Sequence, residues 1–150
     1  MKNPFLKIAI YCVMAGISSF YFTAASAQHH DGYVRALKNL REAHWLLDHR
    51  PGNWAQSADE RQAESLIEAA VTEINSASVQ DGKGWAYRPD FQEVTDRPGR
   101  LRQVIGFLKA AKQDVLTEHD VNGGYDARGH AIQQLDGAIA ATNNAIANRR

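Results

Sequence analysis

The fold is decided by the segment LKNLREAHWLL, residues Leu37–Leu47. Its apolar residues recur every three or four positions, which is the spacing of one face of an α-helix. The segment IGFLKAAKQDV (Ile105–Val115) repeats this pattern 68 positions later, so that Leu40 is matched by Leu108. The sequence therefore predicts the same kind of amphipathic helix twice.

A second pair of segments shares this offset. The stretch AESLIEAAV at 63–71 falls on AIQQLDGAI at 131–139. Because two separate pairs of segments agree on one offset, we interpret the chain as a helical hairpin used twice. Repeat 1 covers about residues 31–81 and repeat 2 about residues 97–149.

Capping residues set the expected helix ends. The first helix begins near Asp31, a good N-cap, and stops before the Pro-Gly pair at 51–52. The second opens with the capping-box pattern at 57–60 and ends near residue 81. The third is expected from about 96–99 to 122–124, and the fourth from Asp126. We expect an all-α fold, a four-helix bundle built from two tandem helical hairpins.

The middle connection, residues 81–95, leaves the direction of the third helix open. It is longer than most bundle loops, and about 15 extended residues span up to roughly 50 Å. The third helix therefore runs either antiparallel or parallel to the second. Trp85 and Tyr87 in this connection indicate either an aromatic partner-binding loop or rings that cover an open end of the core.

Residues 1–27 have the build of a bacterial secretory signal peptide. Lys2 and Lys7 precede an uncharged, mostly apolar run at 8–22. This run is shorter than the roughly 20 residues of a membrane-spanning helix. The triplet 25–27, Ala-Ser-Ala, has the small residues of a cleavage site. We expect cleavage after Ala27, one domain over residues 28–150, a periplasmic or secreted location, and no stable membrane anchor after cleavage.

The composition of residues 28–150 excludes several classes of function. Without Lys2 and Lys7, 15 basic residues stand against 17 acidic ones. This balance argues against a nucleic-acid binder, which carries a basic face. The only cysteine, Cys12, and both methionines precede the expected cleavage site. Disulfides, iron–sulfur clusters and thiolate sites for Cu(I) are therefore excluded from the mature chain.

A first candidate metal site lies at one end of the bundle. His44 and His119 fall on the inward faces of the first and third helices, and Glu60 and Glu64 on that of the second. If helix directions alternate, these side chains share one pole. Imidazole and carboxylate groups from different helices can bind Zn(II), Cu(II) or Ni(II). The alternative is a hydrogen-bonded polar layer at the end of the bundle.

A second candidate depends on the expected cleavage. The new N-terminus would read Gln-His-His, with His29 and His30 at its second and third positions. A free amine followed by histidine at position three is a chelating pattern for Cu(II) or Ni(II). The alternative is a pair of polar residues at a frayed end.

Trp45 and Leu46 fall on the outward side of the first helix when Leu40 is taken as the inward reference. Outward apolar residues can mark a surface for a protein partner or for a second copy of the chain. Packing of Trp54 against Trp45 is the alternative explanation.

Motifs of known enzymes are absent from the sequence. It has no Gly-x-Ser-x-Gly, no phosphate-binding glycine loop and no Glu-x-x-His of di-iron bundles. We therefore expect no enzymatic activity and no cofactor other than a divalent transition metal. The leading expectation is a non-enzymatic structural or interaction module in the periplasm, and the alternative is a periplasmic metal buffer.

The organisation of the whole mature chain resembles that of small periplasmic four-helix-bundle metal-binding proteins. The resemblance lies in the signal peptide, the cysteine-free mature chain, the tandem alanine-rich helices and the scattered histidines. It implies an all-α bundle that binds transition metals. Those proteins, however, carry many more histidines than the six present here.

Overall fold

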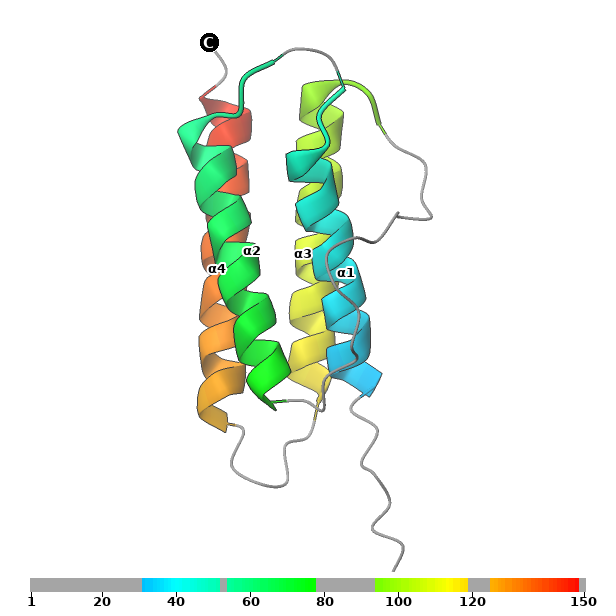
Figure 1. Cartoon of the computed structure of the whole chain (residues 1–150), viewed down its shortest axis with the longest axis vertical. Helices are drawn as coiled ribbons and strands as arrows, with labels where there is room; N and C mark the ends of the chain where they lie inside the picture. Colours follow the sequence, from blue (N-terminus) through cyan, green and yellow to red (C-terminus); the bar gives the residue numbers. More distant parts are fainter. Residues whose placement is uncertain (1–30, 52–53, 78–93, 119–124, 149–150) are drawn as a thin grey trace, which may run out of the picture.

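Apolar residues at helical spacing build four helices: α1 (Asp31–Asp48), α2 (Ala58–Ala77), α3 (Arg97–Thr117) and α4 (Tyr125–Ala147). The computed structural model describes residues 31–51, 54–77, 94–118 and 125–148, and no strand occurs within these ranges. The predicted all-α four-helix bundle is confirmed (Figure 1). No helix in the described ranges is both long and apolar enough to cross a membrane.

The predicted caps of α2 and α3 are present. At α2, the Ser57 N–H donates to Glu60 Oε2 at 2.6 Å and the Glu60 N–H donates to Ser57 Oγ at 3.1 Å. This reciprocal pair is a capping box. At α3, the Asp96 carboxylate accepts the Gly99 N–H at 2.8 Å. Each of these helices therefore begins where its sequence satisfies the free N–H groups of its first turn.

Side chains at the two ends of α3, from Arg100 in its first turn and from Glu118 directly after it, bind both ends of α1. Glu118 Oε2 accepts the Gly32 N–H at 2.7 Å at the beginning of α1. Arg100 donates from Nε to the Leu46 carbonyl at 2.8 Å and from Nη2 to the His49 carbonyl at its end. An anion at the N-terminus and a cation at the C-terminus both complement the dipole of α1. The two helices are therefore antiparallel neighbours.

Further contacts fix the remaining helix directions. Glu60 and Arg97 bring the first turns of α2 and α3 together, and Asn148 reaches Asp59 from the end of α4. We call the end of the bundle where α1 and α4 end and α2 and α3 begin the upper pole, and the other end the lower pole (Figure 1). Helices α2 and α3 therefore run parallel, with the end of α2 at the lower pole and the start of α3 at the upper pole.

This topology decides between the two directions that the sequence left open for the third helix. The ends of α1 and α3 lie at opposite poles, because Glu118 follows α3 and meets Gly32 at the start of α1. The up-down-up-down arrangement that placed both ends at one pole is therefore wrong. The bundle has one long crossover connection instead.

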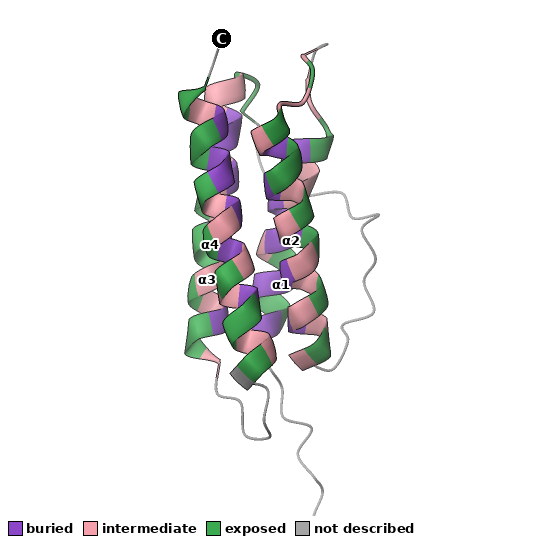
Figure 2. Ribbon diagram, turned by 90° about the vertical axis from the view of Figure 1, so that its left-hand side faces the viewer, coloured by how far each residue is buried: buried purple, intermediate pink, exposed green. Residues whose placement is uncertain are grey.

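The closest helix pairs are α2 with α4 and α1 with α3. Among the residues that the structure describes, nine of the 21 buried apolar ones are alanines, and small side chains allow helices to approach closely. Larger side chains such as Leu40, Ile67 and Leu108 complete the core. Figure 2 shows the buried residues as a stripe along the inner faces of the helices.

Burial follows the repeat that the sequence indicates. Residues 68 positions apart are buried in both halves of the chain: Tyr33 and Leu101, Ala36 and Val104, Leu40 and Leu108, Ala43 and Ala111, Leu47 and Val115, Ala63 and Ala131, Ile67 and Leu135, and Ala70 and Ala138. Each helix also packs closely against its equivalent in the other half. A duplicated hairpin would bury equivalent positions in both halves, as observed here. The duplication itself remains a prediction.

Candidate functional site at the upper pole

Glu60 is held by Arg97 rather than left available as a metal ligand. Arg97 Nε donates to Oε1 at 3.1 Å and Arg97 Nη2 donates to Oε2 at 2.6 Å. The Glu60 side chain is only 3% exposed. Burial raises the pKa of Glu60, but the hydrogen bonds from Arg97 and Ser57 outweigh burial and hold this pKa below its ordinary value. Glu60 therefore serves as the buried anion of an ion pair between α2 and α3.

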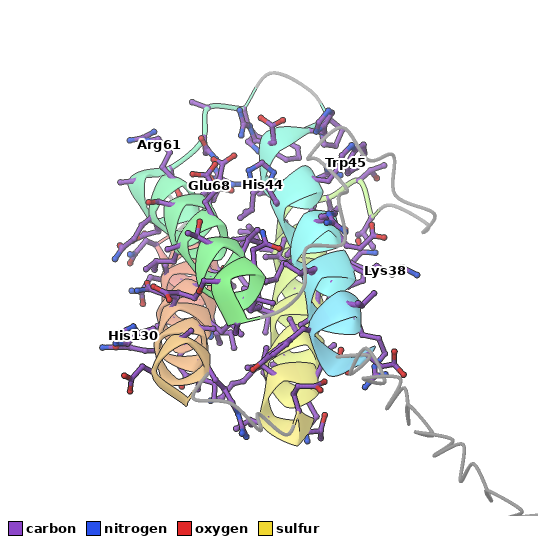
Figure 3. All side chains as sticks on the ribbon, turned by 60° about the horizontal axis from the view of Figure 1, so that its bottom comes forward. Lys38, His44, Trp45, Arg61, Glu68 and His130 are labelled. Atoms are coloured by element: carbon purple, nitrogen blue, oxygen red, sulfur yellow. The ribbon has the colours of Figure 1, made fainter. Side chains whose placement is uncertain are left out.

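His44 lies between two carboxylates across the α1–α2 seam. Its Nε2 is 3.4 Å from Glu64 Oε1 and 3.4 Å from Glu68 Oε1. Gln56 Nε2 donates to the other oxygen of Glu64 at 2.7 Å. In Figure 3, His44 on α1 and Glu68 on α2 point toward one another. The structure thus joins the predicted pair His44 and Glu64.

Glu68 belongs to this cluster although the sequence analysis did not include it. It follows Glu64 by one helical turn, so the two glutamates lie on neighbouring positions of the same face. That spacing was the signal that could have identified it.

The other predicted metal ligands are not brought into this cluster. His119 lies outside the described residues, and α3 ends just before it at the lower pole, whereas His44 belongs to the last turns of α1. His29 and His30 also lie outside the described residues. Within the part of the chain that the structure describes, no three His, Cys, Asp or Glu side chains are arranged to hold a metal ion.

Trp45 is engaged within the molecule. Its ring stacks on His49 with centroids 4.6 Å apart and planes 7° from parallel. The Arg100 guanidinium lies 5.4 Å from the Trp45 ring centroid, within the range of a cation–π contact. The predicted partner residues Trp85 and Tyr87 lie outside the described residues.

The expectation that Leu46 faces outward is wrong, because this residue is 1% exposed. Helix α1 contacts both α2 and α3, so its buried arc is wider than the single stripe centred on Leu40. Leu46 lies toward the α3 side of this arc, where its carbonyl accepts the hydrogen bond from Arg100.

The sequence analysis also missed Arg97 and Arg100, which organise the upper pole. Both lie in the first turn of α3, where positive charge opposes the helix dipole. A cation in that unfavourable position needs a partner outside its own helix. Glu60 is the partner of Arg97, and the carbonyls at the end of α1 are acceptors for Arg100. This conflict with the dipole was the available signal.

Comparison of the chain with protein-family models, with curated proteins and with solved structures finds no match.

Proposed function

We propose that this chain is an exported, non-enzymatic helical bundle that acts as a structural or interaction module in the periplasm. The observation that supports this proposal is that the candidate chemical groups at the upper pole bind one another. Glu60 is engaged by Arg97, and Trp45 contacts both His49 and Arg100. A catalytic site instead presents its reactive groups to substrate in a cleft. Here these side chains instead form contacts that join the end of α1 to the first turns of α2 and α3.

Export is the first part of this proposal that can be tested. The signal-peptide pattern of residues 1–27 supports cleavage after Ala27. Intact-mass analysis of the protein in the periplasmic fraction should give a chain that begins at Gln28 or its pyroglutamate. Full-length chain held in the inner membrane would contradict this expectation.

The lower pole is the surface where we expect a partner. Of the three exposed large apolar side chains in the described residues, Val34 and Leu116 lie at this pole. Each is two residues from the Gly32–Glu118 contact, which joins the start of α1 to the end of α3. The two side chains lie on different helices at the same end of the domain, and we propose that each contributes to contact with a partner there.

Site-specific photocrosslinking in cells tests this surface. A photoreactive residue at position 34 or 116 should give a discrete adduct, whereas one at Ala140, exposed in the middle of α4, should not. Mass spectrometry of the adduct separates a second copy of this chain from another protein. Adducts from all three positions, or from none, would contradict a partner surface at the lower pole.

Binding of Zn(II), Cu(II) or Ni(II) is the second candidate function. It is favoured by the 3.4 Å approach of His44 Nε2 to Glu64 and to Glu68, and by the resemblance to periplasmic metal-binding bundles. In the described residues these three side chains are not arranged as a metal site, so metal binding would require them to move closer together. Calorimetric titration of the exported protein, beside His44→Ala, distinguishes the candidates. Tight binding that His44→Ala abolishes would support metal buffering at this cluster. Tight binding that the substitution leaves unchanged would instead indicate the Gln28-His29-His30 terminus, and absence of binding would favour the structural or interaction module.

A further inference from the structure

The first hairpin (α1 and α2) and the second hairpin (α3 and α4) complete one another's core. The most extensive helix contacts lie between the hairpins, α1 with α3 and α2 with α4, whereas α1 and α2 contact each other least of the neighbouring pairs. Ion pairs also join the two hairpins, from Glu60 to Arg97 and from Arg35 to Asp114. Each hairpin is therefore the main packing partner of the other.

Equivalent residues form the α1–α3 contact twice. Gly32 and Arg100 are 68 positions apart, as are Leu46 and Asp114. At the upper pole, Arg100 Nε donates to the Leu46 carbonyl at 2.8 Å. At the lower pole, a Cβ atom built at Gly32 would lie 2.7 Å from the Asp114 carbonyl oxygen. The two hairpins are therefore arranged like the two subunits of a symmetric dimer, in which each contact recurs with the partners reversed.

The equivalent residues nevertheless differ in charge, and this difference opposes pairing of a first hairpin with another first hairpin. Glu118 accepts the Gly32 N–H at the start of α1. The residue 68 positions before Glu118 is Arg50. In a pair of first hairpins, Arg50 would replace Glu118 at that helix start, where the dipole disfavours positive charge. A first hairpin is therefore better matched to a second hairpin, whether from its own chain or from another copy.

The connection between the hairpins is shorter when it leads to another copy. The end of α2 and the start of α3 lie at opposite poles, roughly 30 Å apart along the bundle for a helix of 20 residues. If two bundles lie side by side and antiparallel, the lower pole of one is beside the upper pole of the other. A connection from α2 of one bundle to α3 of its neighbour then has to cross only the spacing of packed helices, about 10 Å.

From this topology we infer that a second copy of this chain is a partner for the interface between the hairpins, in a dimer that exchanges hairpins reciprocally. The first hairpin of each copy packs on the second hairpin of the other, and the two bundles lie side by side and antiparallel. Each bundle keeps one hairpin of each kind, so the contacts between hairpins are retained, as is usual in domain swapping. The exchange uses the inner faces of the helices, so it is independent of the partner surface proposed at the lower pole.

A pair of cysteines across the α2–α4 contact distinguishes exchange from ordinary association. A Cβ atom built at Gly137 on α4 would lie 3.9 Å from Leu66 Cγ on α2. A protein that begins at Gln28 and carries Leu66→Cys with Gly137→Cys has no other cysteine. Tethered partners have an effective concentration in the millimolar range, so refolding from urea is compared at about 10 μM and about 1 mM before oxidation.

We expect internal disulfides in monomers at the lower concentration, and at the higher one a covalent dimer whose fraction has risen by roughly tenfold or more. Intact-mass analysis under denaturing, non-reducing conditions measures both species. Leu66→Cys alone is the control, because each bundle of an exchanged dimer contains only one residue 66. The proposal would be overturned by the absence of a covalent dimer, by native dimers whose disulfides are internal, or by equal covalent dimer in the control.

The length of the connection provides a second test, without cysteines. Deletion of residues 82–91 leaves 78–81 and 92–93 between the described ends Ala77 and Val94, a span of up to roughly 25 Å. This span is too short for the length of the bundle but reaches a neighbouring bundle. Because the effective concentration falls to near zero when a linker cannot span its sites, the shortened protein should be a dimer even at about 10 μM.

Replacement of residues 82–91 by ten glycine and serine residues is the matched control, since it changes the sequence and keeps the length. The replaced protein should stay monomeric at the concentration where the shortened one is dimeric. Size-exclusion chromatography with light scattering gives the masses, and circular dichroism confirms the helices. A shortened protein that is a helical monomer, or equal dimer in both variants, would contradict the exchange geometry.

Discussion

Single residues at the ends of α3 hold the beginning and the end of α1. At the beginning of α1, the contact of Gly32 with Glu118 leaves no room for a larger side chain. A Cβ atom built at Gly32 would overlap Glu118 Oε2 and would lie 2.7 Å from the Asp114 carbonyl oxygen. The first of these neighbours belongs to a side chain, but the second is backbone and cannot turn away. Glycine is therefore required at this contact by close approach rather than by an unusual backbone angle.

Gly32→Ala should destabilise the protein by about 1–3 kcal/mol, the usual cost of forcing an extra methyl group into a packed contact. Urea unfolding of the purified protein measures the change. Gly106→Ala is the matched control, because a Cβ atom there meets nothing within 4 Å. Alanine in that helix interior should stabilise by about 0.5–1 kcal/mol. Equal effects of the two substitutions would contradict the close packing at Gly32.

Arg97→Gln should destabilise the protein near pH 7 by about 1–3 kcal/mol, because Glu60 would stay buried without its charged partner. The pKa of Glu60 is lowered in the folded protein, so its ion pair contributes stability above the ordinary carboxyl pKa of 4.5. This contribution is lost as the pH falls through the lowered folded pKa. The difference between wild type and variant should therefore shrink on acidification, as urea unfolding at about pH 7 and pH 3 would show. A difference that stays constant would argue against an ionic role for Arg97.

The individual helices could be predicted well from the sequence, but which helices pack against one another could not. The period of apolar residues and the caps at Ser57 and Asp96 depend on local sequence, and the structure reproduces them. The burial of Leu46 depends on which helices cover α1, which no local pattern encodes. The candidate site follows the same division. Glu60 is buried and His44 lies at the α1–α2 seam, but their partners Arg97 and Glu68 depend on how helices are placed in space.

Equivalent positions of the two halves should respond alike to truncation. Leu40 and Leu108 lie 68 positions apart, and both are fully buried. Leu40→Ala and Leu108→Ala should each cost about 2–5 kcal/mol, the range for buried leucines. Val34→Ala, at an exposed position of α1, should change stability by less than about 0.5 kcal/mol. Denaturant midpoints of the three variants provide the comparison. A large loss for only one of the two leucines would contradict equivalent roles in the two halves.

The whole molecule is defined by the crossover that makes α2 and α3 parallel. Residues 81–95 are long enough to allow either direction of α3, so sequence reasoning had to leave both open. The direction is decided by contacts between distant residues, above all Glu60 with Arg97 and Gly32 with Glu118. The direction of α3 also decides which polar groups meet at the upper pole. It brings the arginines of α3 beside the end of α1, and it places the end of α3 at the pole away from His44.

Distances between spin labels test this topology directly. No cysteine follows Cys12, so a protein that begins at Gln28 can be labelled at single introduced cysteines. Arg61, Arg102 and Thr117 are exposed, near the starts of α2 and α3 and at the end of α3. Along α3 the last two positions are separated by roughly 22 Å, at 1.5 Å per residue. Parallel α2 and α3 predict a clearly shorter mean distance for the pair 61–102 than for the pair 61–117. The reverse order would show that α3 runs antiparallel to α2 and would contradict both the crossover and the upper pole built on it.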